Sequence, residues 1–399
     1  MRKSVLAVVA VTLLLTLGCE QGNNQRFTVI NYSWTTTDTK YLHDNVTEME
    51  KRPFDGVCVF VAHPRREHGS VLSGTYRADL GWSVFWNKRF QPETVEGAVH
   101  DLRTTRFRKF RSNYLVTVAF LHTGDFMDWF DDQWWSNITS NAALMAQVAH
   151  RGGCEGILFD AEQYRGTLWQ YSKLKQQDRY KDVAFEVLAQ QVRQRGREYI
   201  RAVNQGYPGT RMLLLFAWEW LIRGTEGDHA RLSEQRYGLY YYFLEGMLEA
   251  ADEKTVFIDG VEEYRATEKK DFEALARRVR QDGPKFTTQP ENFARKVRVG
   301  FGIWMDRGGK WNSLDVEKNS WTPDKFRKAV GYALLASDGF LWIYNERPSW
   351  LLDSPEDKLA NGVGFGSEGR NKQITWVSPA YDRALKAGRQ RAQETAQGK

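Results

Sequence analysis

Eight short segments of the chain are almost entirely apolar, and longer segments with helical spacing of their apolar positions separate them. The apolar segments are rich in β-branched and aromatic residues and span residues 27–34, 54–63, 114–122, 156–164, 212–218, 255–261, 297–306 and 339–346. Continuous apolar runs of this length are typical of parallel strands that are buried on both faces. The pattern therefore predicts eight buried β-strands.

The intervening segments predict amphipathic helices over residues 41–52, 95–107, 141–151, 180–203, 237–251, 272–279, 323–336 and 380–392. Thr322 and Pro323 mark a helix start, because a hydroxyl can cap the first turn and proline suits its first position. Eight strand–helix alternations predict a single (β/α)₈ barrel, an α/β fold, over residues 27–399. A doubly wound open sheet is the alternative, but residues 31–34 (NYSW) do not form a glycine-rich phosphate loop.

The N-terminus has the pattern of an export signal. Arg2 and Lys3 precede an apolar run over residues 5–17. A run of that length is too short for a permanent membrane-spanning helix and suits a secretory signal peptide.

Gly18 and Cys19 directly follow the apolar run, and a small residue before a cysteine at this point resembles the bacterial lipobox. Thr16 stands where that motif usually has Leu. The resemblance implies that residues 1–19 are a lipoprotein signal, that Cys19 is acylated, and that residues 20–26 form a polar tether. The protein would then be exported and held on the periplasmic or cell-surface side of the envelope by lipid. An ordinary signal peptide with a chance cysteine is the alternative.

Charge and motifs narrow the class of function. The formal charge is +6, but lysines and arginines are mixed with acids along the chain, so nucleic acid is not an expected partner. A Gly-x-Ser-x-Gly elbow, a phosphate loop and a His-Glu-x-x-His motif are all absent, which disfavours serine hydrolases, nucleotide enzymes and zincins. We expect no organic cofactor and no metal, and the sequence leaves the oligomeric state open.

Two acids end the fourth predicted strand, at the position where barrel enzymes place their active sites. Asp160 and Glu162 are two residues apart, so they lie on one face of an extended strand. Close carboxylates repel each other and raise one pKa, as a proton donor requires. The alternative is structural: Asp160 caps the next helix and Glu162 pairs with Arg165.

Residues 156–162 (GILFDAE) resemble the end of the strand-four signature of chitinase-type glycoside hydrolases, which are built on the same barrel. The resemblance implies that Glu162 is the proton donor and that Asp160 is its neighbour. Glu155 and Leu158 stand where the longer motif has aspartates, so chemistry assisted by an N-acetyl group is not implied. Residues 339–342 (GFLW) resemble the ending whose tryptophan floors the sugar site, which implies that role for Trp342.

A second carboxylate is needed for glycoside hydrolysis. Either Glu262 or Glu263 could face the barrel mouth after the sixth strand. Glu263 is favoured because side chains alternate along a strand, which places Glu263 on the same face as Asp259. Glu346, at the end of the eighth strand, is the next candidate. Each of Glu263 and Glu346 is equally compatible with a salt-bridge role.

A different layout combines Asp160 with Glu219 and Asp306 at the ends of strands four, five and seven. It resembles the carboxylate triad of the α-amylase clan, but the flanking motifs of that clan are missing. This layout therefore ranks lower.

Aromatic residues crowd the predicted strand ends and loops. Their flat faces match the C–H faces of pyranose rings, although they could instead pack the long loops onto the barrel rim. The expected carbohydrate-binding residues are Trp34, His63, Trp82, Trp86, His122, Trp129, Tyr164, Trp218, Trp304, Asp306, Trp342 and Tyr344.

The combined hypothesis is a lipid-anchored barrel that acts as a glycoside hydrolase. Glu162 would be the general acid, Asp160 would tune it, and Glu263 or Glu346 would be nucleophile or base. The rival hypothesis is a non-catalytic carbohydrate-binding lipoprotein on the same barrel, and a third is a barrel enzyme with non-sugar chemistry. An enzyme needs two acids that face each other across roughly 5–10 Å, whereas a binding protein does not.

Overall fold

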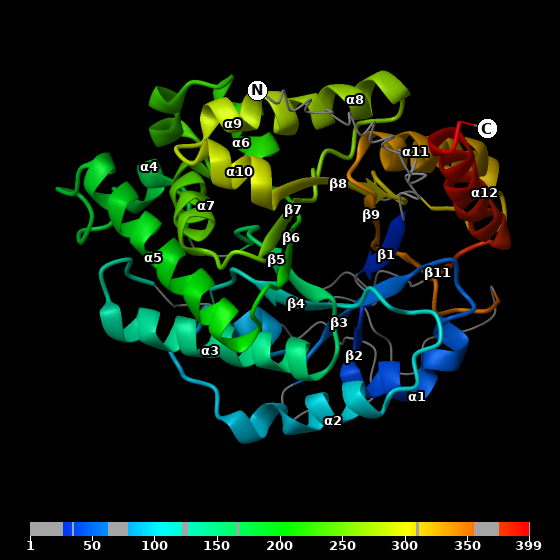
Figure 1. Ribbon diagram of the computed structural model, residues 1–399, viewed down its shortest axis with the longest axis horizontal. Helices are drawn as coiled ribbons and strands as arrows, with labels where there is room; N and C mark the ends of the chain where they lie inside the picture. The colour runs from blue at the N-terminus through cyan, green and yellow to red at the C-terminus, as the bar shows by residue number, and fades with distance from the viewer. Residues whose placement is uncertain are drawn as a thin grey trace, which may run out of the picture.

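Eight parallel strands close into a barrel at the centre of the molecule (Figure 1). The computed structural model describes residues 27–33, 36–62, 79–121, 127–164, 167–308, 311–354 and 375–398. The barrel strands are β1 (Thr28–Ser33), β3 (Gly56–Phe60), β4 (Tyr114–Val118), β5 (Gly156–Asp160), β6 (Arg211–Leu214), β7 (Val256–Asp259), β8 (Val297–Trp304) and β9 (Phe340–Asn345). Each pairs in parallel with its neighbours, and β1 pairs with both β9 and β3. The predicted (β/α)₈ fold is confirmed.

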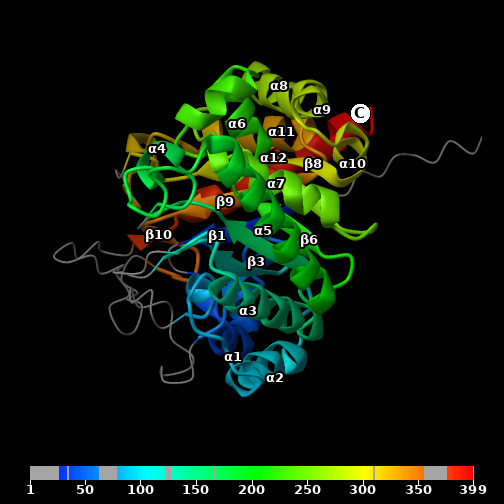
Figure 2. The ribbon, with the colours of Figure 1, turned by 90° about the vertical axis from the view of Figure 1, so that its left-hand side faces the viewer.

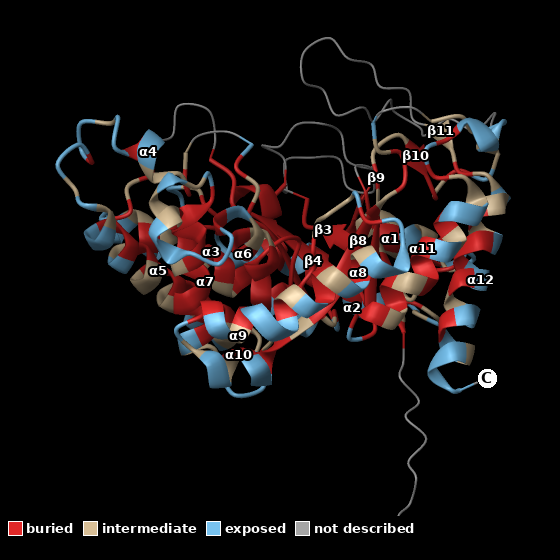
Figure 3. Cartoon of the chain, turned by 90° about the horizontal axis from the view of Figure 1, so that it is seen from above, coloured by how far each residue is buried: buried red, intermediate tan, exposed pale blue. Residues whose placement is uncertain are grey.

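Helices surround the strands on the outside of the barrel (Figure 1). They are α1 (Thr39–Met49), α2 (Glu96–Thr104), α3 (Asp132–Arg151), α4 (Tyr171–Leu174), α5 (Phe185–Gly206), α6 (Trp218–Thr225), α7 (Gly238–Ala250), α8 (Lys269–Arg277), α9 (Gly283–Phe286), α10 (Pro290–Lys296), α11 (Pro323–Ala336) and α12 (Pro379–Ala396). Their buried faces point to the sheet and their exposed faces point outward (Figure 3). Two further short parallel strands, β10 (Pro348–Ser349) and β11 (Thr375–Trp376), pair outside the barrel, and β2 (Thr37–Asp38) extends the edge of β3.

Side chains cap the helices where the sequence supplies them. Thr322 accepts the backbone N–H of Lys325 at the start of α11, with Pro323 in the first turn, as the sequence predicts. Asp38 caps α1 by accepting the backbone N–H of Tyr41. Capped starts of this kind satisfy backbone donors that would otherwise lack partners.

The barrel closes between its first and last strands. β1 pairs with β9 over six residues, from Thr28 opposite Phe340 to Ser33 opposite Asn345. Its pairing with β3 covers only Ile30 opposite Gly56 and Asn31 opposite Val57. On the last helix, Arg389 donates to the backbone carbonyl of Phe27 (3.1 Å) and to Asp55 Oδ1 (3.0 Å), which fastens the start of β1.

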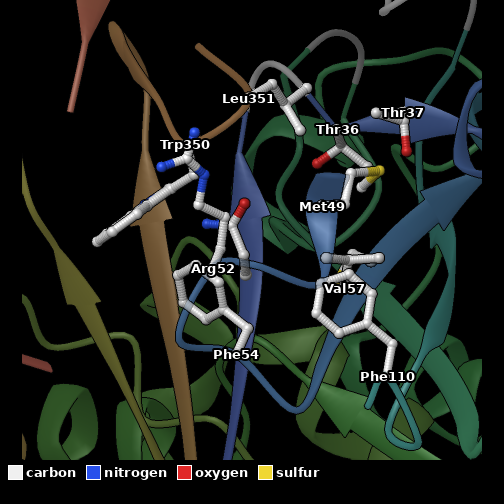
Figure 4. Close-up of a pocket in the computed structure, with 11 residues that line it drawn as sticks. Thr36, Thr37, Met49, Arg52, Phe54, Val57, Phe110, Trp350 and Leu351 are labelled. Atoms are coloured by element: carbon white, nitrogen blue, oxygen red, sulfur yellow. The ribbon is translucent and has the colours of Figure 1, made fainter. Parts of the chain in front are cut away.

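A small cavity of about 20 Å³ lies beside the short β1–β3 pairing (Figure 4). Phe54, Val57, Phe110 and Trp350 are among the side chains around it. Its volume is that of about one water molecule, so it is a packing defect of the barrel wall and has no room for a sugar.

The carboxyl ends of the strands share one side of the molecule. The short helix α4, which follows β5, and the strand β10, which follows β9, both lie on that side (Figure 2). The active sites of this barrel class lie at this end. Every residue that follows a strand directly is therefore brought to one rim.

Candidate functional site

Asp160 is the last residue of β5, and its side chain is completely buried. Its Oδ1 accepts the backbone N–H of Glu162 (2.8 Å), and its Oδ2 accepts the Tyr164 hydroxyl (3.2 Å). Burial, together with the nearby negative charge of Glu162, raises the pKa of Asp160 to about 8. Asp160 therefore holds a proton at neutral pH, and Glu162 follows it onto the rim, where it is only partly buried.

Glu262 joins these two acids from the end of β7. Its Oε1 accepts the Tyr264 hydroxyl (2.6 Å). Burial raises the pKa of Glu262 well above the usual range, and the negative charges of Glu162 and Asp160 raise it further. Within the described part of the chain, no lysine or arginine forms an ion pair with Asp160, Glu162 or Glu262. We refer to these three residues as the acid cluster.

The structure corrects the placement of Glu263, which strand alternation from Asp259 favoured for the rim. Val261 has a positive φ of 39°, a conformation that β-branched residues rarely adopt. This turn ends the alternation of the strand, so that Glu262 lies beside Glu162. Glu263 Oε2 instead forms an ion pair with Arg223 (3.1 Å), a residue of α6.

The α-amylase-like layout is not assembled, because Glu219 lies in an ion-pair network. Glu219 is buried and pairs with both Arg223 (3.3 Å) and Arg278. Burial raises its pKa and the two arginines oppose that shift. We refer to Glu219, Glu263, Arg223 and Arg278 as the arginine network.

Asp259, the last residue of β7, is also structural. It accepts the backbone N–H groups of Glu219 (2.9 Å) and Val261 (3.2 Å), and burial raises its pKa to about 7. The first turn of α6 thereby gains a cap from the neighbouring strand.

Asp306 joins the loops that follow β8 and β9. Its carboxylate accepts the indole N–H of Trp304 (2.9 Å) and the backbone N–H groups of Glu346 (2.9 Å) and Arg347 (2.9 Å). With its oxygens occupied in this way, Asp306 positions the rim and is not a free sugar ligand. Glu346 is partly buried at the end of β9, with its backbone fixed by Asp306.

Aromatic rings form a wall beside the acid cluster. Tyr264 stacks near Tyr344 (6.2 Å between ring centres) and meets Trp304 edge-on (5.3 Å). Trp342 lies beneath them, fully buried, and donates its indole N–H to the backbone carbonyl of Gly260 (2.9 Å). Tyr32 completes the wall from β1, 5.7 Å from Tyr344.

Glycine at position 302 makes room for the ring of Trp342. A Cβ at Gly302 would lie 2.4 Å from Trp342 Cζ2, which no packing adjustment of a buried indole could accommodate. The position of Trp342 in the wall thus depends on the absence of a side chain on the neighbouring strand.

A second aromatic group lies on the β5 side of the rim. Trp82 meets Phe120 edge-on (5.3 Å) and lies 5.5 Å from Tyr164, which is 48% exposed. Because Tyr164 donates to Asp160, these rings adjoin the acid cluster. Trp86 is partly buried further along the same loop, with the Lys88 ammonium 4.9 Å from its ring centre.

Three predicted carbohydrate-binding residues are core residues: Trp342, which is fully buried beneath the aromatic wall and so is not a sugar-contacting floor, and Trp129 and Trp218. Trp129 is fully buried and stacks on Trp135 (5.0 Å), so it fixes its loop against the helices. Trp218 begins α6 because β6 ends at Leu214, and it packs edge-on against Phe293 (5.2 Å). None of the three rings is accessible to a sugar, and these three placements are wrong.

Other predicted positions lie outside the described residues, namely Trp34, His63, His122 and Cys19. The described part contains no group of three or more His, Cys, Asp or Glu side chains arranged to hold a metal ion. It also contains no helix with the length and apolar character to span a membrane.

Sequence reasoning ranked Glu262 below Glu263 and did not predict Tyr264 or Tyr32 as rim residues. The signal available for Glu262 was its neighbour Gly260, which marks a strand end where strict alternation stops. Tyr264 was visible as an aromatic residue two positions beyond Glu262, but its hydroxyl contact with Glu262 depends on the turn at Val261.

Comparison with known proteins gives distant structural similarity only. No protein-family model and no curated protein matches the chain. Among solved structures, a GH113 β-1,4-mannanase is 11% identical with a TM-score of 0.45, and the similarity covers 92% of this chain and 99% of that one. The GH113 β-mannanase AaManA from Alicyclobacillus acidocaldarius is 13% identical (TM-score 0.42; 92% and 98% covered). A sugar phosphate isomerase/epimerase from Parabacteroides distasonis is 10% identical (TM-score 0.35; 92% and 94% covered). At these values the similarities carry no argument about activity, which has to come from the site.

Proposed function

We propose that the protein is a glycoside hydrolase whose acid cluster cleaves a glycosidic bond. The observation that carries this proposal is the raised pKa of Asp160 and Glu262 at one rim, beside Glu162 and a wall of aromatic rings. Unpaired acids in a partly buried site are costly to folding, and such sites are typical of acid–base catalysis.

In this proposal Glu262 is the proton donor. Its raised pKa favours the neutral form of the carboxyl, and a neutral carboxyl can protonate the leaving glycosidic oxygen. The sequence resemblance implied that Glu162 was the acid, but the pKa shift favours Glu262 for that role. Glu162 is then the carboxylate that attacks the anomeric carbon or activates water.

Asp160 supports this pair without touching the sugar. Its Oδ1 holds the backbone N–H of Glu162, so it fixes the turn that carries that carboxylate. Because its own proton stays bound near neutral pH, it adds little negative charge to the site. Asp160 is thus a positioning residue.

The aromatic wall supports a carbohydrate as the substrate. Tyr264, Tyr344 and Trp304 come from three neighbouring strand ends and border Glu262. Rings of this kind offer flat apolar faces with polar edges, which suit the C–H faces and hydroxyl groups of a pyranose.

Hydrolysis of a glycan panel by the purified mature protein tests the proposal. The panel contains mannan, chitin, cellulose, polygalacturonate and carrageenan, and new reducing ends are counted. We expect Glu162→Gln and Glu262→Gln each to lower the rate by about 10²–10⁴-fold. The matched control is Glu263→Gln, which alters the next residue in an ion pair and should retain activity within about threefold.

Two outcomes would contradict the hydrolase. Equal rates for wild type and both variants would remove the acid cluster from the mechanism. Tight glycan binding with no release of reducing ends would favour the rival, a non-catalytic carbohydrate-binding protein that uses the same aromatic wall.

We also propose export and lipid anchoring through Cys19, on the basis of the lipobox-like N-terminus. Expression of the full chain in a bacterium with radiolabelled palmitate tests this. We expect the wild type to be labelled and recovered with membranes, and Cys19→Ser to be unlabelled. Equal membrane recovery of both forms would reject the anchor.

A further inference from the structure

An open groove of about 680 Å³ lies next to the aromatic wall, between the segment that leads into α8, the turn after β8, and α11. These two helices pack side by side on the outside of the barrel (Figure 1). The volume is within the range of ligand sites in proteins. Tyr264 lines the groove and also donates its hydroxyl to Glu262, so the groove shares a wall with the acid cluster.

Positive charge dominates this groove. Arg307, Lys325 and Lys328 line it, against the single acid Glu268. The Glu268 carboxylate caps α8 by accepting the backbone N–H of Asp271, so its charge is already engaged by that helix start.

The three cations of the groove differ in whether a neighbouring acid neutralises their charge. Lys328 pairs with Asp324 (2.9 Å), which lies on its own helix. Arg307 uses one N–H to reach the backbone carbonyl of Tyr264 (2.6 Å), and Lys325 is exposed; neither forms an ion pair with any described residue. The contact with Tyr264 fixes the guanidinium at the shared wall and leaves its other N–H groups available to a ligand.

Aromatic rings form part of the remaining lining, together with the small polar residues Thr267 and Ser320. Trp321 and Tyr332 lie in the same groove as the cations. A ligand that fits must therefore offer an anionic group to Arg307 and Lys325 and a flat or apolar face to the rings. A sugar unit that carries a carboxylate or a sulfate ester has both properties, and a guanidinium can hold either oxyanion with two parallel N–H bonds.

We propose that this groove binds an anionic saccharide unit, so that the protein acts on a glycan carrying carboxylate or sulfate groups. The saccharide part of this inference rests on the proposed function, whereas the preference for negative charge rests on the groove alone. Bound there, the anionic unit would extend the chain whose neighbouring unit reaches Glu262.

Binding of defined tetrasaccharides, measured by calorimetry on the full mature protein, tests the proposal. The probes are tetragalacturonate, its fully methyl-esterified form and a carrageenan tetrasaccharide that carries sulfate esters without carboxylates. We expect at least one charged probe to bind about tenfold tighter than the neutral ester at about 0.05 M salt, and this preference to shrink at about 0.5 M salt because screening shortens the reach of the charges. The two charged probes distinguish carboxylate from sulfate recognition.

Charge-removing variants locate the preference. We expect Lys325→Gln with Lys328→Gln, and separately Arg307→Gln, to reduce the preference for the charged probe to less than about threefold, while affinity for the neutral ester stays the same. The matched control is Lys254→Gln with Lys285→Gln, two exposed lysines that do not line the groove, and it should keep the full preference.

Equal affinity for charged and neutral probes would overturn the proposal, and so would a preference that survives in the groove variants. Absence of binding by every charged probe would also overturn it. The outcome is separable from that of the hydrolase test. Charge-dependent binding without hydrolysis would support the groove proposal and contradict the hydrolase proposal. Hydrolysis of neutral glycans without a charge preference would support the hydrolase proposal and contradict the groove proposal.

Discussion

Two groups of acids lie at the ends of neighbouring strands of this barrel, and they differ in their partners. In the arginine network, Arg223 and Arg278 surround Glu219, and Arg223 also reaches Glu263. In the acid cluster, the charges of Asp160, Glu162 and Glu262 interact with one another, and Asp160 and Glu262 accept hydrogen bonds from Tyr164 and Tyr264.

The difference lies in how each environment acts on the protonation of its carboxylates. In the arginine network, the two guanidinium groups favour the ionised form of Glu219 and oppose the rise in its pKa that burial causes. An acid placed beside other acids, and partly removed from water, keeps its proton to a higher pH. The contrast therefore assigns a structural role to the network and supports the acid cluster as the site of the proposed chemistry.

The largest expected effect is on activity, from Glu262→Gln. Loss of the acidic proton should reduce the hydrolysis rate by about 10²–10⁴-fold while the urea midpoint of unfolding stays about the same, because a neutral amide replaces a carboxyl whose ionised form is disfavoured by burial. Rate assays and urea titration on one preparation provide both readouts. A variant that lost stability as well as activity would place Glu262 in the structural group.

The opposite behaviour is expected for the network. Arg278→Met leaves the buried Glu219 with one arginine, and we expect the free energy of unfolding to fall by about 3 kcal/mol. Activity per folded molecule should change less than about threefold, measured below the unfolding transition. Unchanged stability would mean that Arg223 alone compensates Glu219.

The third effect is on the pH dependence of stability. Asp160 has a pKa of about 8 in the folded protein and an ordinary value of 3.8, so between these values the folded state binds the extra proton. Stability from this residue is therefore greatest at low pH and is lost as pH rises toward 8, with a slope of at most about 1.4 kcal/mol per pH unit.

Asp160→Asn removes that dependence. Urea unfolding between pH 5 and pH 9 should show a shallower decline for the variant than for the wild type. Parallel curves would show that Asp160 ionises normally.

The smallest effect is a shift in the pH profile of the rate from Tyr264→Phe. The Tyr264 hydroxyl stabilises ionised Glu262, so its removal should raise the pKa of Glu262 further and move the alkaline limb upward by about one pH unit or less. Tyr171→Phe is a suitable control, since the Tyr171 hydroxyl donates to a backbone carbonyl outside the cluster. An alkaline limb that moved to lower pH would mean that a residue other than Glu262 is the proton donor.

The sequence predicted the barrel because buried parallel strands leave a strong local signal. All eight predicted apolar segments contain a strand, but several extend past the strand end. Residues 212–218 were predicted as one strand, whereas β6 stops at Leu214 and Trp218 enters a helix. Strand ends depend on where neighbouring strands stop pairing, which is a property of the closed barrel.

The site was predictable only in part, for a related reason. The pair Asp160 and Glu162 follows from alternation along one strand. Glu262, and not Glu263, belongs to the acid cluster because Val261 has a positive φ. The β-branched side chain of Val261 gives no reason to expect that conformation. The burial of Trp129 depends on Trp135, which lies on the next helix, so composition alone could not separate packing rings from binding rings.

The closure of the barrel through β1 and β9 has a consequence for how the chain folds. The side chain of Asn31 bonds to the backbone of Ile343, 312 residues later, and Arg389 fastens the residue that precedes β1. The first strand thus has to wait for nearly the whole polypeptide before its longest edge finds a partner. Contacts that span so much chain delay the final folding step, so we expect the ring to close only after β9 has been synthesised.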